Sequence, residues 1–261
     1  QTATNVIDYV QIETTGNAVD IGDLTIARMY LASCSSTTRG LFGGGMNGGF
    51  TAQSSIDYVT IATTGNAINF GNLTGTRTSG SGCSSPTRAL FAGGENGAGN
   101  TNAIDYVTIA TTGNALSFGQ LTSARYGLAA CSSSTRGVFG GGNSGAASNV
   151  VDYVTTATTG NATSFGQLTV ARYDTSACSS TTRGVFGGGN TGAASNVLDY
   201  ITIASAGNAT DFGDLNNAVS RLAACSSSLR GLFAGGIAGP LNVFDYFTIA
   251  STGNATDFGD L

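Results

Sequence analysis

Apolar stretches, polar turns and glycine clusters follow one another along this chain in an order that repeats. Between residues 169 and 215 there are four stretches that carry apolar or aromatic residues, divided by a polar turn, a glycine-rich loop and a Gly-Asn pair. They are Tyr173–Cys178, Gly184–Phe186, Val197–Ile203 and Ala209–Leu215. The 3.6-residue periodicity of helices is missing and Gly-Asn pairs permit tight hairpin turns, so the pattern predicts four short β-strands per unit.

The third stretch of the unit is mostly apolar on both faces. Ile56 and Tyr58 point to one side of the predicted strand, whereas Val59 and Ile61 point to the other. A sheet with one face in solvent would alternate apolar and polar residues. The sheet that contains this strand is therefore expected to lie between two other sheets.

An Asp-Tyr pair marks the third stretch and recurs every 46 to 49 residues. It begins at Asp8, Asp57, Asp105, Asp152, Asp199 and Asp245. A cysteine follows each of the first five aspartates by 26 residues, at Cys34, Cys83, Cys131, Cys178 and Cys225. All variation in length falls between a cysteine and the next aspartate. Four strands in about 47 residues is the size of a propeller blade, whereas β-helices usually have shorter coils.

We therefore expect an all-β propeller of four-stranded blades. An N-terminal half-blade, residues 1–24, carries only a third and a fourth strand. Five complete repeats follow it, over residues 25–73, 74–121, 122–168, 169–215 and 216–261. Six blade positions are favoured, with closure of the five complete repeats by themselves as the alternative.

The repeat resembles the blade of the kelch family. That blade carries an Arg before its first strand, apolar residues that end in two glycines, then a Tyr and then an aromatic residue. In the fourth repeat these are Arg172, Val185-Phe186 before Gly187-Gly188, Tyr200 and Phe212. Phe stands where kelch blades usually have Trp, and the fifth repeat has Val219 in the Arg position. The resemblance covers almost the whole chain and implies a propeller, but it implies no particular function.

The wording of the repeat has a narrower likeness. The strings IDYVTIATTGNA, CSSPTR and LFAGG are similar to tandem repeats in predicted structural and tail-fibre-like proteins of phages of marine cyanobacteria. This likeness implies a virion appendage.

Composition argues against several partners. The ten basic residues are all Arg and the net charge is −5, so binding to nucleic acid is not expected. No apolar run of 18 residues is present, which argues against insertion into a membrane. No signal peptide follows Gln1, and we expect a processed chain or a part of a longer repeat protein.

The residues needed for common catalytic sites are missing. The chain has no His, which excludes copper sites of the galactose oxidase type and Ser-His-Asp hydrolysis. The five cysteines are 47 to 49 residues apart, without a CxxC pair, and we expect them to be reduced, unbridged and packed as small apolar side chains. We therefore expect neither an enzyme nor a cofactor.

The aspartates and one set of arginines form a predicted structural ladder, one pair in each repeat. Asp57 shares a strand face with Val59 and Ile61, and a buried carboxylate without a partner is very costly. Arg binds carboxylates with two parallel hydrogen bonds. We expect Asp57, Asp105, Asp152, Asp199 and Asp245 to pair with Arg39, Arg88, Arg136, Arg183 and Arg230. The alternative is a ring of these arginines that binds an anionic glycan.

The variable loop after the glycine cluster is the candidate binding face, because insertions between repeats often map to the face that binds. Its candidate residues are Met46, Phe50, Glu95, Asn143, Asn190, Ile237 and Leu241. Drift in a tolerant loop is the alternative.

Function is expected to be structural and adhesive. We predict a fibre-like phage appendage, at the virion surface or otherwise extracellular, that contacts host glycans or other subunits. The alternative is a secreted bacterial surface protein or filament. We expect the half-blade at residues 1–24 to associate with another copy or another surface protein, because its apolar strand Val6–Val10 lacks an inner neighbour.

Overall fold

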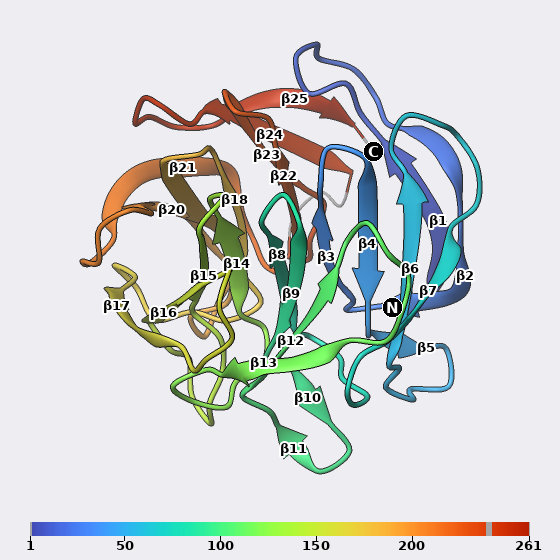
Figure 1. Ribbon diagram of the computed structural model, residues 1–261. Coiled ribbons are helices and arrows are strands. Elements are labelled where there is room, and N and C mark those ends of the chain that lie inside the picture. The colour runs from blue at the N-terminus through green and yellow to red at the C-terminus, as the bar shows by residue number, and fades with distance from the viewer. Residues whose placement is uncertain (1, 239–241, 261) are drawn as a thin grey trace.

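The computed structural model describes residues 2–238 and 242–260, and it is a six-bladed β-propeller (Figure 1). Its strands run antiparallel within each blade and the blades follow one another around a central channel. The prediction of six blade positions is confirmed. The alternative, closure of five repeats by themselves, is wrong.

Five blades have four strands each, ordered from the channel outward. The first contains β3 (Ala32–Ser35), β4 (Arg39–Gly43), β6 (Ser55–Thr60) and β7 (Ile68–Asn72). The second contains β8 (Ser81–Ser84), β9 (Arg88–Ala92), β12 (Ala103–Thr108) and β13 (Leu116–Gln120). The third contains β14 (Ala129–Ser132), β15 (Arg136–Gly140), β16 (Val150–Thr155) and β17 (Thr163–Gln167).

The last two complete blades repeat this order. The fourth contains β18 (Ser176–Ser179), β19 (Arg183–Gly187), β20 (Ser195–Thr202) and β21 (Thr210–Val219). The fifth contains β22 (Ala223–Ser226), β23 (Arg230–Ala234), β24 (Val243–Thr248) and β25 (Thr256–Asp260). A small hairpin of β10 (Glu95–Asn96) and β11 (Gly99–Asn100) projects from the variable loop of the second blade (Figure 1).

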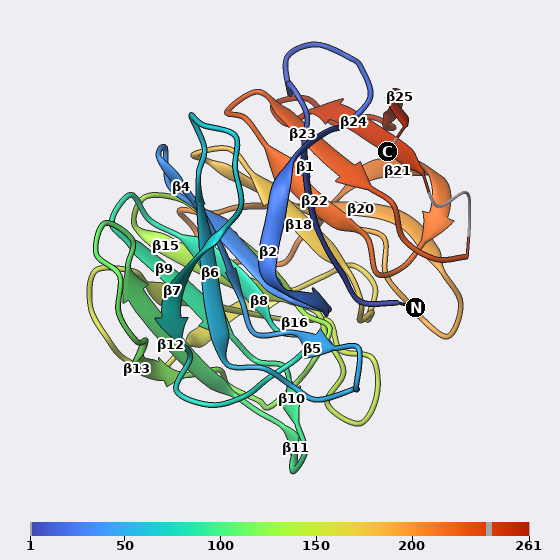
Figure 2. The same ribbon diagram turned by 90° about the vertical axis from the view of Figure 1, so that its right-hand side faces the viewer.

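The half-blade occupies the outer part of the sixth position. It is built from β1 (Thr4–Tyr9) and β2 (Val19–Met29), and β5 (Met46–Asn47) pairs with the end of β2. Figure 2 shows β1 and β2 between the fifth and first blades. The Ala18 N–H donates to the Asp260 carbonyl oxygen, and the Gly65 N–H donates to the Ile21 carbonyl oxygen, so the half-blade is bonded to both neighbours.

One motif explains how neighbouring blades join. The N–H groups of Gly113 and Ala115 donate to carbonyls of the fourth strand of the preceding blade. A Cβ on Gly71 in that strand would lie 2.2 Å from the Gly113 carbonyl oxygen, so only glycine permits this approach. The recurring Phe-Gly and Gly-Asn pairs are therefore the two halves of one joint between blades.

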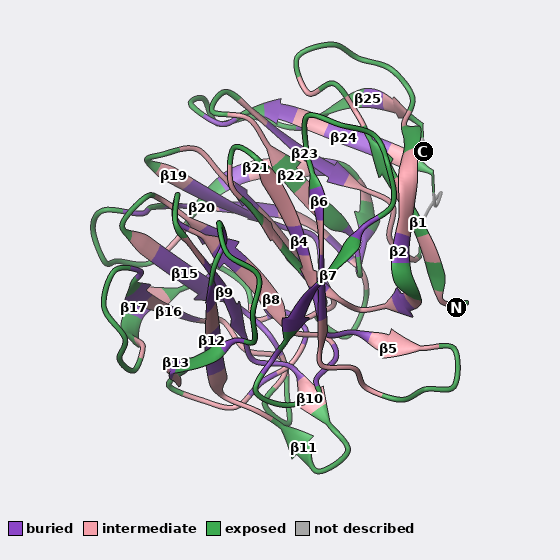
Figure 3. Ribbon diagram, turned by 45° about the vertical axis from the view of Figure 1, so that its right-hand side comes forward, coloured by how far each residue is buried: buried purple, intermediate pink, exposed green. Residues whose placement is uncertain are grey.

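The core consists of apolar layers between blades. In the layer between the first two blades, the buried residues include Leu41, Ile56, Phe70 and Phe91. The third strands contribute from both faces, as their apolar pattern predicted. Figure 3 shows buried residues in each complete blade, whereas β1 and β22 have none along their lengths. Among the described residues there is no helix long and apolar enough to cross a membrane.

Candidate functional site

The aspartates of the repeat are buried and ion-paired in the first four complete blades. The carboxylates of Asp57, Asp105, Asp152 and Asp199 lie 2.5 to 3.0 Å from a guanidinium nitrogen. Their partners are Arg28, Arg77, Arg125 and Arg172, respectively. The prediction of a buried Asp–Arg pair is confirmed for these blades, but the predicted choice of arginine is wrong.

The strand register explains the correction. Arg39 lies opposite Thr60, whereas Asp57 lies opposite Phe42 at the other end of the pair of strands. Arg28 enters the blade beside Asp57 and also donates to the carbonyl oxygens of Gly44 and Ser55. Burial lowers the pKa of Arg28, and the Asp57 charge opposes that shift. These pairs stabilise the fold and are not accessible to a ligand.

The arginines of the second strands have a different structural role. The Arg39 guanidinium lies 4.5 Å from the ring centre of Tyr58 and donates to the Ile109 carbonyl oxygen in the next blade. Arg88, Arg136, Arg183 and Arg230 repeat both contacts. These guanidinium groups are therefore engaged with the protein, and the alternative of a ring that binds an anionic glycan stays a prediction.

The fifth blade departs from the pattern. Asp245 has Asn216 as its partner in place of an arginine, with the Asn216 side-chain nitrogen 2.5 Å from its carboxylate. Val219 occupies the position of the missing arginine. Burial raises the pKa of Asp245, and hydrogen bonds from Asn216 oppose that rise.

The cysteines pack against glycines of neighbouring blades. A Cβ on Gly137, Gly184 or Gly231 would lie 2.3 to 2.9 Å from the Sγ atom of a cysteine. Burial raises the pKa of the Cys83 thiol to about 12, so this side chain is a neutral thiol at neutral pH. The described residues contain no cluster of three or more Cys, Asp or Glu suited to a metal ion.

The variable loops begin at one rim of the propeller. One residue at the start of each loop forms a β-bridge with the residue directly after the first arginine position of the repeat. These loop residues are Met46, Glu95, Asn143, Asn190 and Ile237. The side chains of Asn143 and Asn190 accept N–H bonds within their own loops, so they serve as turn formers. Phe50 is 73% exposed at a loop tip, and the candidate residue Leu241 lies outside the described residues.

A ring of residues that the sequence did not reveal lies next to these loops. Each complete repeat places one residue, two positions after the Arg slot, in the left-handed backbone region. These residues are Tyr30, Ser79, Gly127, Asp174 and Arg221, with φ between 52° and 63°. Non-glycine residues rarely adopt this conformation, and strain retained at one position is often linked to function. Their spacing follows the repeat, but their chemistry differs from blade to blade.

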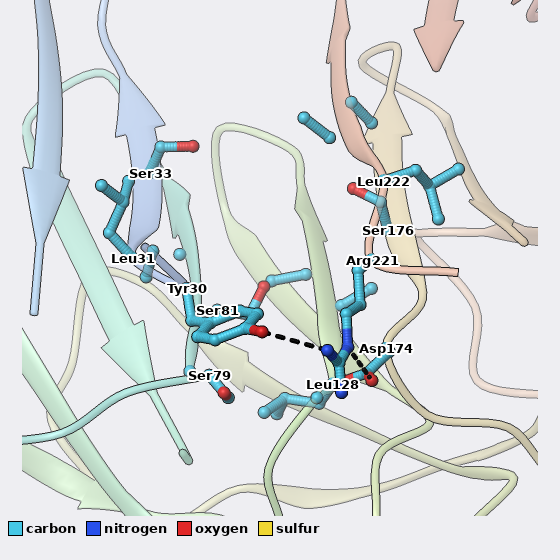
Figure 4. Close-up of a pocket in the computed structure, with 18 of the residues that line it drawn as sticks. Tyr30, Leu31, Ser33, Ser79, Ser81, Leu128, Asp174, Ser176, Arg221 and Leu222 are labelled. Atoms are coloured by element: carbon cyan, nitrogen blue, oxygen red, sulfur yellow. Dashed lines mark hydrogen bonds and ion pairs between the residues drawn. The ribbon is translucent and has the colours of Figure 1, made fainter. Parts of the chain in front are cut away.

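This ring surrounds the mouth of the central channel. The mouth is a cavity of 530 Å³, lined by the ring and by the start of each innermost strand. Figure 4 shows Arg221 between Asp174 and Tyr30. Its Nε atom lies 2.9 Å from the Asp174 carboxylate and its NH1 atom 3.0 Å from the Tyr30 hydroxyl oxygen.

The mouth combines charge, hydroxyl groups and an aromatic face. The hydrogen bond to Asp174 raises the pKa of Arg221, which stays charged. The Arg221 guanidinium also lies 5.3 Å from the ring centre of Tyr30. Fixed donors and acceptors beside an aromatic ring suit a small polar molecule.

Comparison with protein-family models and with curated proteins gives no match for this chain. The fold and the mouth therefore define the class of protein: a six-bladed β-propeller whose channel mouth carries one varied residue from each complete repeat.

Proposed function

We propose that this protein is a non-enzymatic adhesion module whose channel mouth binds a sugar of a surface glycan. The observation that carries this proposal is the strained ring, in which Tyr30, Asp174 and Arg221 keep side chains at a position where glycine would cost least. Structural positions of the repeat hold one residue type in nearly every blade. The ring residues differ, as expected of positions that serve a ligand.

The chemistry of the mouth fits a sugar better than an apolar ligand. Arg221 supplies charged donors, Asp174 supplies acceptors, and Tyr30 supplies an aromatic face with a hydroxyl group. Sugars present many hydroxyl groups around a flat apolar ring and use all three. The side chains of the ring are half-buried or exposed, so a ligand reaches them from solvent.

We propose the biological context of this binding from the amino-acid sequence of the repeat. Its likeness to phage repeat proteins, and the kelch-like blade, support a fibre-like appendage at a virion surface that contacts host glycans. The runner-up is a secreted bacterial surface or filament protein. The incomplete sixth blade favours that second setting, because an open blade edge serves assembly.

A glycan array of bacterial surface sugars, followed by titration calorimetry with the best binder, tests the proposal. We expect Arg221→Gln to weaken binding by tenfold or more and Tyr30→Phe to weaken it less. Leu229→Thr is the matched control, because Leu229 is 60% exposed in the turn between β22 and β23. No sugar bound by the wild-type protein, or equal binding by the Arg221 variant, would contradict the proposal.

A further inference from the structure

Among the residues that the structure describes, none forms the two inner strands of the sixth blade position. In the complete blades the third strand pairs on both edges, as β12 does with β9 and β13. Strand β1 is the equivalent of β12, and among the described residues it pairs only with β2. A largely apolar cavity of 740 Å³ lies along its open edge, between the fifth and first blades.

Each wall of this cavity carries one partner of a cysteine–glycine contact whose other partner is missing. In filled positions a thiol packs against the next blade, as Cys131 does against Gly184. At the open position Cys225, on the fifth blade, is exposed. Gly40, on the first blade, has only Val59 near its Cβ position. A hairpin seated here would give Cys225 a glycine and would bring a cysteine to Gly40.

Carbonyl groups that accept hydrogen bonds from an arginine at the other blade positions have no such donor at the sixth position. Arg230 of the fifth blade donates to the carbonyl oxygens of Ile12 and Glu13 in the half-blade. The equivalent residues of the first blade are Ile61 and Ala62, which line the cavity. Ile61 is 49% exposed, whereas its equivalent Ile109 in the second blade is 2% exposed. The arginine that would cover Ile61 belongs to the missing strands.

The half-blade itself keeps the residues that, in complete blades, contact arginines of the two inner strands and the segment before them. Asp8 is the equivalent of the buried Asp57, but it is exposed and has no ion pair among the described residues. Tyr9 is 40% exposed, whereas its equivalent Tyr58 is covered by Arg39. These two side chains lack the arginines that cover their equivalents.

A chain of serine contacts around the channel stops at the same place. The Ser179 hydroxyl donates to the Ser132 carbonyl oxygen, and the Ser226 hydroxyl donates to the Ser179 carbonyl oxygen. The Ser84 hydroxyl makes the same contact with Ser35. The Ser84 N–H donates to the Ser132 hydroxyl and joins the two parts, so the chain runs from Ser35 to Ser226. One serine on a sixth inner strand would complete the circle.

We propose that the open sixth position is a docking site for a β-hairpin with the inner-strand sequence of this repeat, supplied by another repeat-bearing chain. Such a hairpin carries Arg ahead of Ala-Cys-Ser-Ser and then Arg-Gly-Val-Phe-Gly-Gly, which matches every uncovered group described above. A second copy of this chain has its own five hairpins in place, so it is not the favoured donor. The proposal does not rest on sugar binding at the mouth.

A synthetic peptide with the sequence of residues 169–188 tests the docking site. It contains the first two strands of the fourth blade, together with Arg172 for Asp8 and Arg183 for the Ile61 carbonyl. Binding of the labelled peptide to the intact protein is followed by fluorescence anisotropy. We expect saturable binding with one peptide for each protein, and at least tenfold weaker binding of a scrambled peptide and of one with Arg183→Ala.

The matched protein variants are Gly40→Val and Gly75→Val. The Val at position 40 fills the space that the incoming cysteine needs, because the equivalent positions of other blades are only Gly or Ala. Gly75 has no neighbour within 4 Å, and the equivalent position in the fourth blade is naturally Val170. We expect Gly40→Val to weaken peptide binding at least tenfold and Gly75→Val to leave it unchanged.

Thiol labelling gives a second readout. Cys225 is the exposed cysteine, and trypsin releases it in the fragment of residues 222–230. We expect the bound peptide to slow its alkylation at least fivefold. No saturable binding, equal binding by Gly40→Val, or no protection of Cys225 would each overturn the proposal. A stable dimer of the free protein that buries Cys225 would overturn it in favour of a second copy as the occupant.

Discussion

Replacing Asp152 by Asn is expected to destabilise the propeller strongly. The Asp152 carboxylate lies 2.9 Å from Arg125, and both side chains are fully buried. It also accepts a hydrogen bond of 2.7 Å from the Thr122 hydroxyl, which an Asn side-chain oxygen still accepts. The substitution therefore removes the negative charge and the oxygen that accepts from Arg125 and from the Thr122 N–H, and it leaves the Arg125 cation buried without a partner.

The expected magnitude follows from that unpaired cation. Removing one partner of a buried ion pair costs about 3–5 kcal/mol. With a shift of about 2–4 °C for each kcal/mol in a chain of this size, the melting temperature is expected to fall by about 6–20 °C. Replacing both partners, with Arg125→Met and Asp152→Leu, is expected to recover much of this loss, because well-packed apolar side chains can replace a buried ion pair.

The chain offers a matched control in its fifth blade. Asp245 is equally placed in the repeat but has Asn216 in place of an arginine. Asp245→Asn leaves no buried cation unpaired, so we expect a change of about 1 kcal/mol or less, the net scale of one hydrogen bond. Urea denaturation at neutral pH, followed by circular dichroism, compares the two variants. Equal losses at the two positions, or no loss for Asp152→Asn, would refute the reasoning.

Three further outcomes are expected. Val219→Arg gives Asp245 the missing partner. Because the pKa of Asp245 is raised, the folded wild type binds this proton more tightly than the unfolded chain does. The stability of the wild type therefore falls as pH rises from the ordinary carboxyl range through the raised pKa. Urea titrations at several pH values should find a smaller loss of stability in Val219→Arg. Gly184→Val should lower the urea midpoint, because its Cβ would lie 2.3 Å from the Cys131 Sγ atom. In the free protein, mass spectrometry after brief alkylation near pH 8 should find Cys225 modified well before the buried Cys83, Cys131 and Cys178. Burial raises the pKa of Cys225 as well, so the expected difference rests on the exposure of its thiol.

The architecture could be predicted because each repeat states it again. A third strand that is apolar on both faces, such as Ile56–Ile61, requires a sheet on either side, and Gly-Asn pairs supply the turns. The arginine partner of the aspartate was not predictable in the same way. The second and third strands are joined by the variable loop, so turn length does not fix their register, and the register places Arg39 opposite Thr60, away from Asp57.

The channel mouth escaped prediction for a different reason. Tyr30, Ser79, Gly127, Asp174 and Arg221 share a backbone conformation but no residue type. A position without a shared residue type has the same sequence pattern as drift, and the left-handed φ is visible only in the structure. The variable loops, which the sequence did single out, begin one residue away across the rim. Variation in length therefore indicated the right face of the propeller, but not the residues that surround its channel.

At the open sixth position, exposed residues keep the residue types that the repeat has at buried positions. Solvent-exposed positions are free to become polar, and open strand edges are commonly protected by charge, proline or a bulge. Gly40, Cys225 and the Asp8-Tyr9 pair instead keep the residue types of positions that are covered in the other blades. Along β1 the exposed residues include the apolar Val6 and the aromatic Tyr9, beside Thr4 and Asp8. Retention of buried-type residues on an exposed edge is expected where that edge is covered in the working assembly, and this is the physical ground for seeking a donated hairpin.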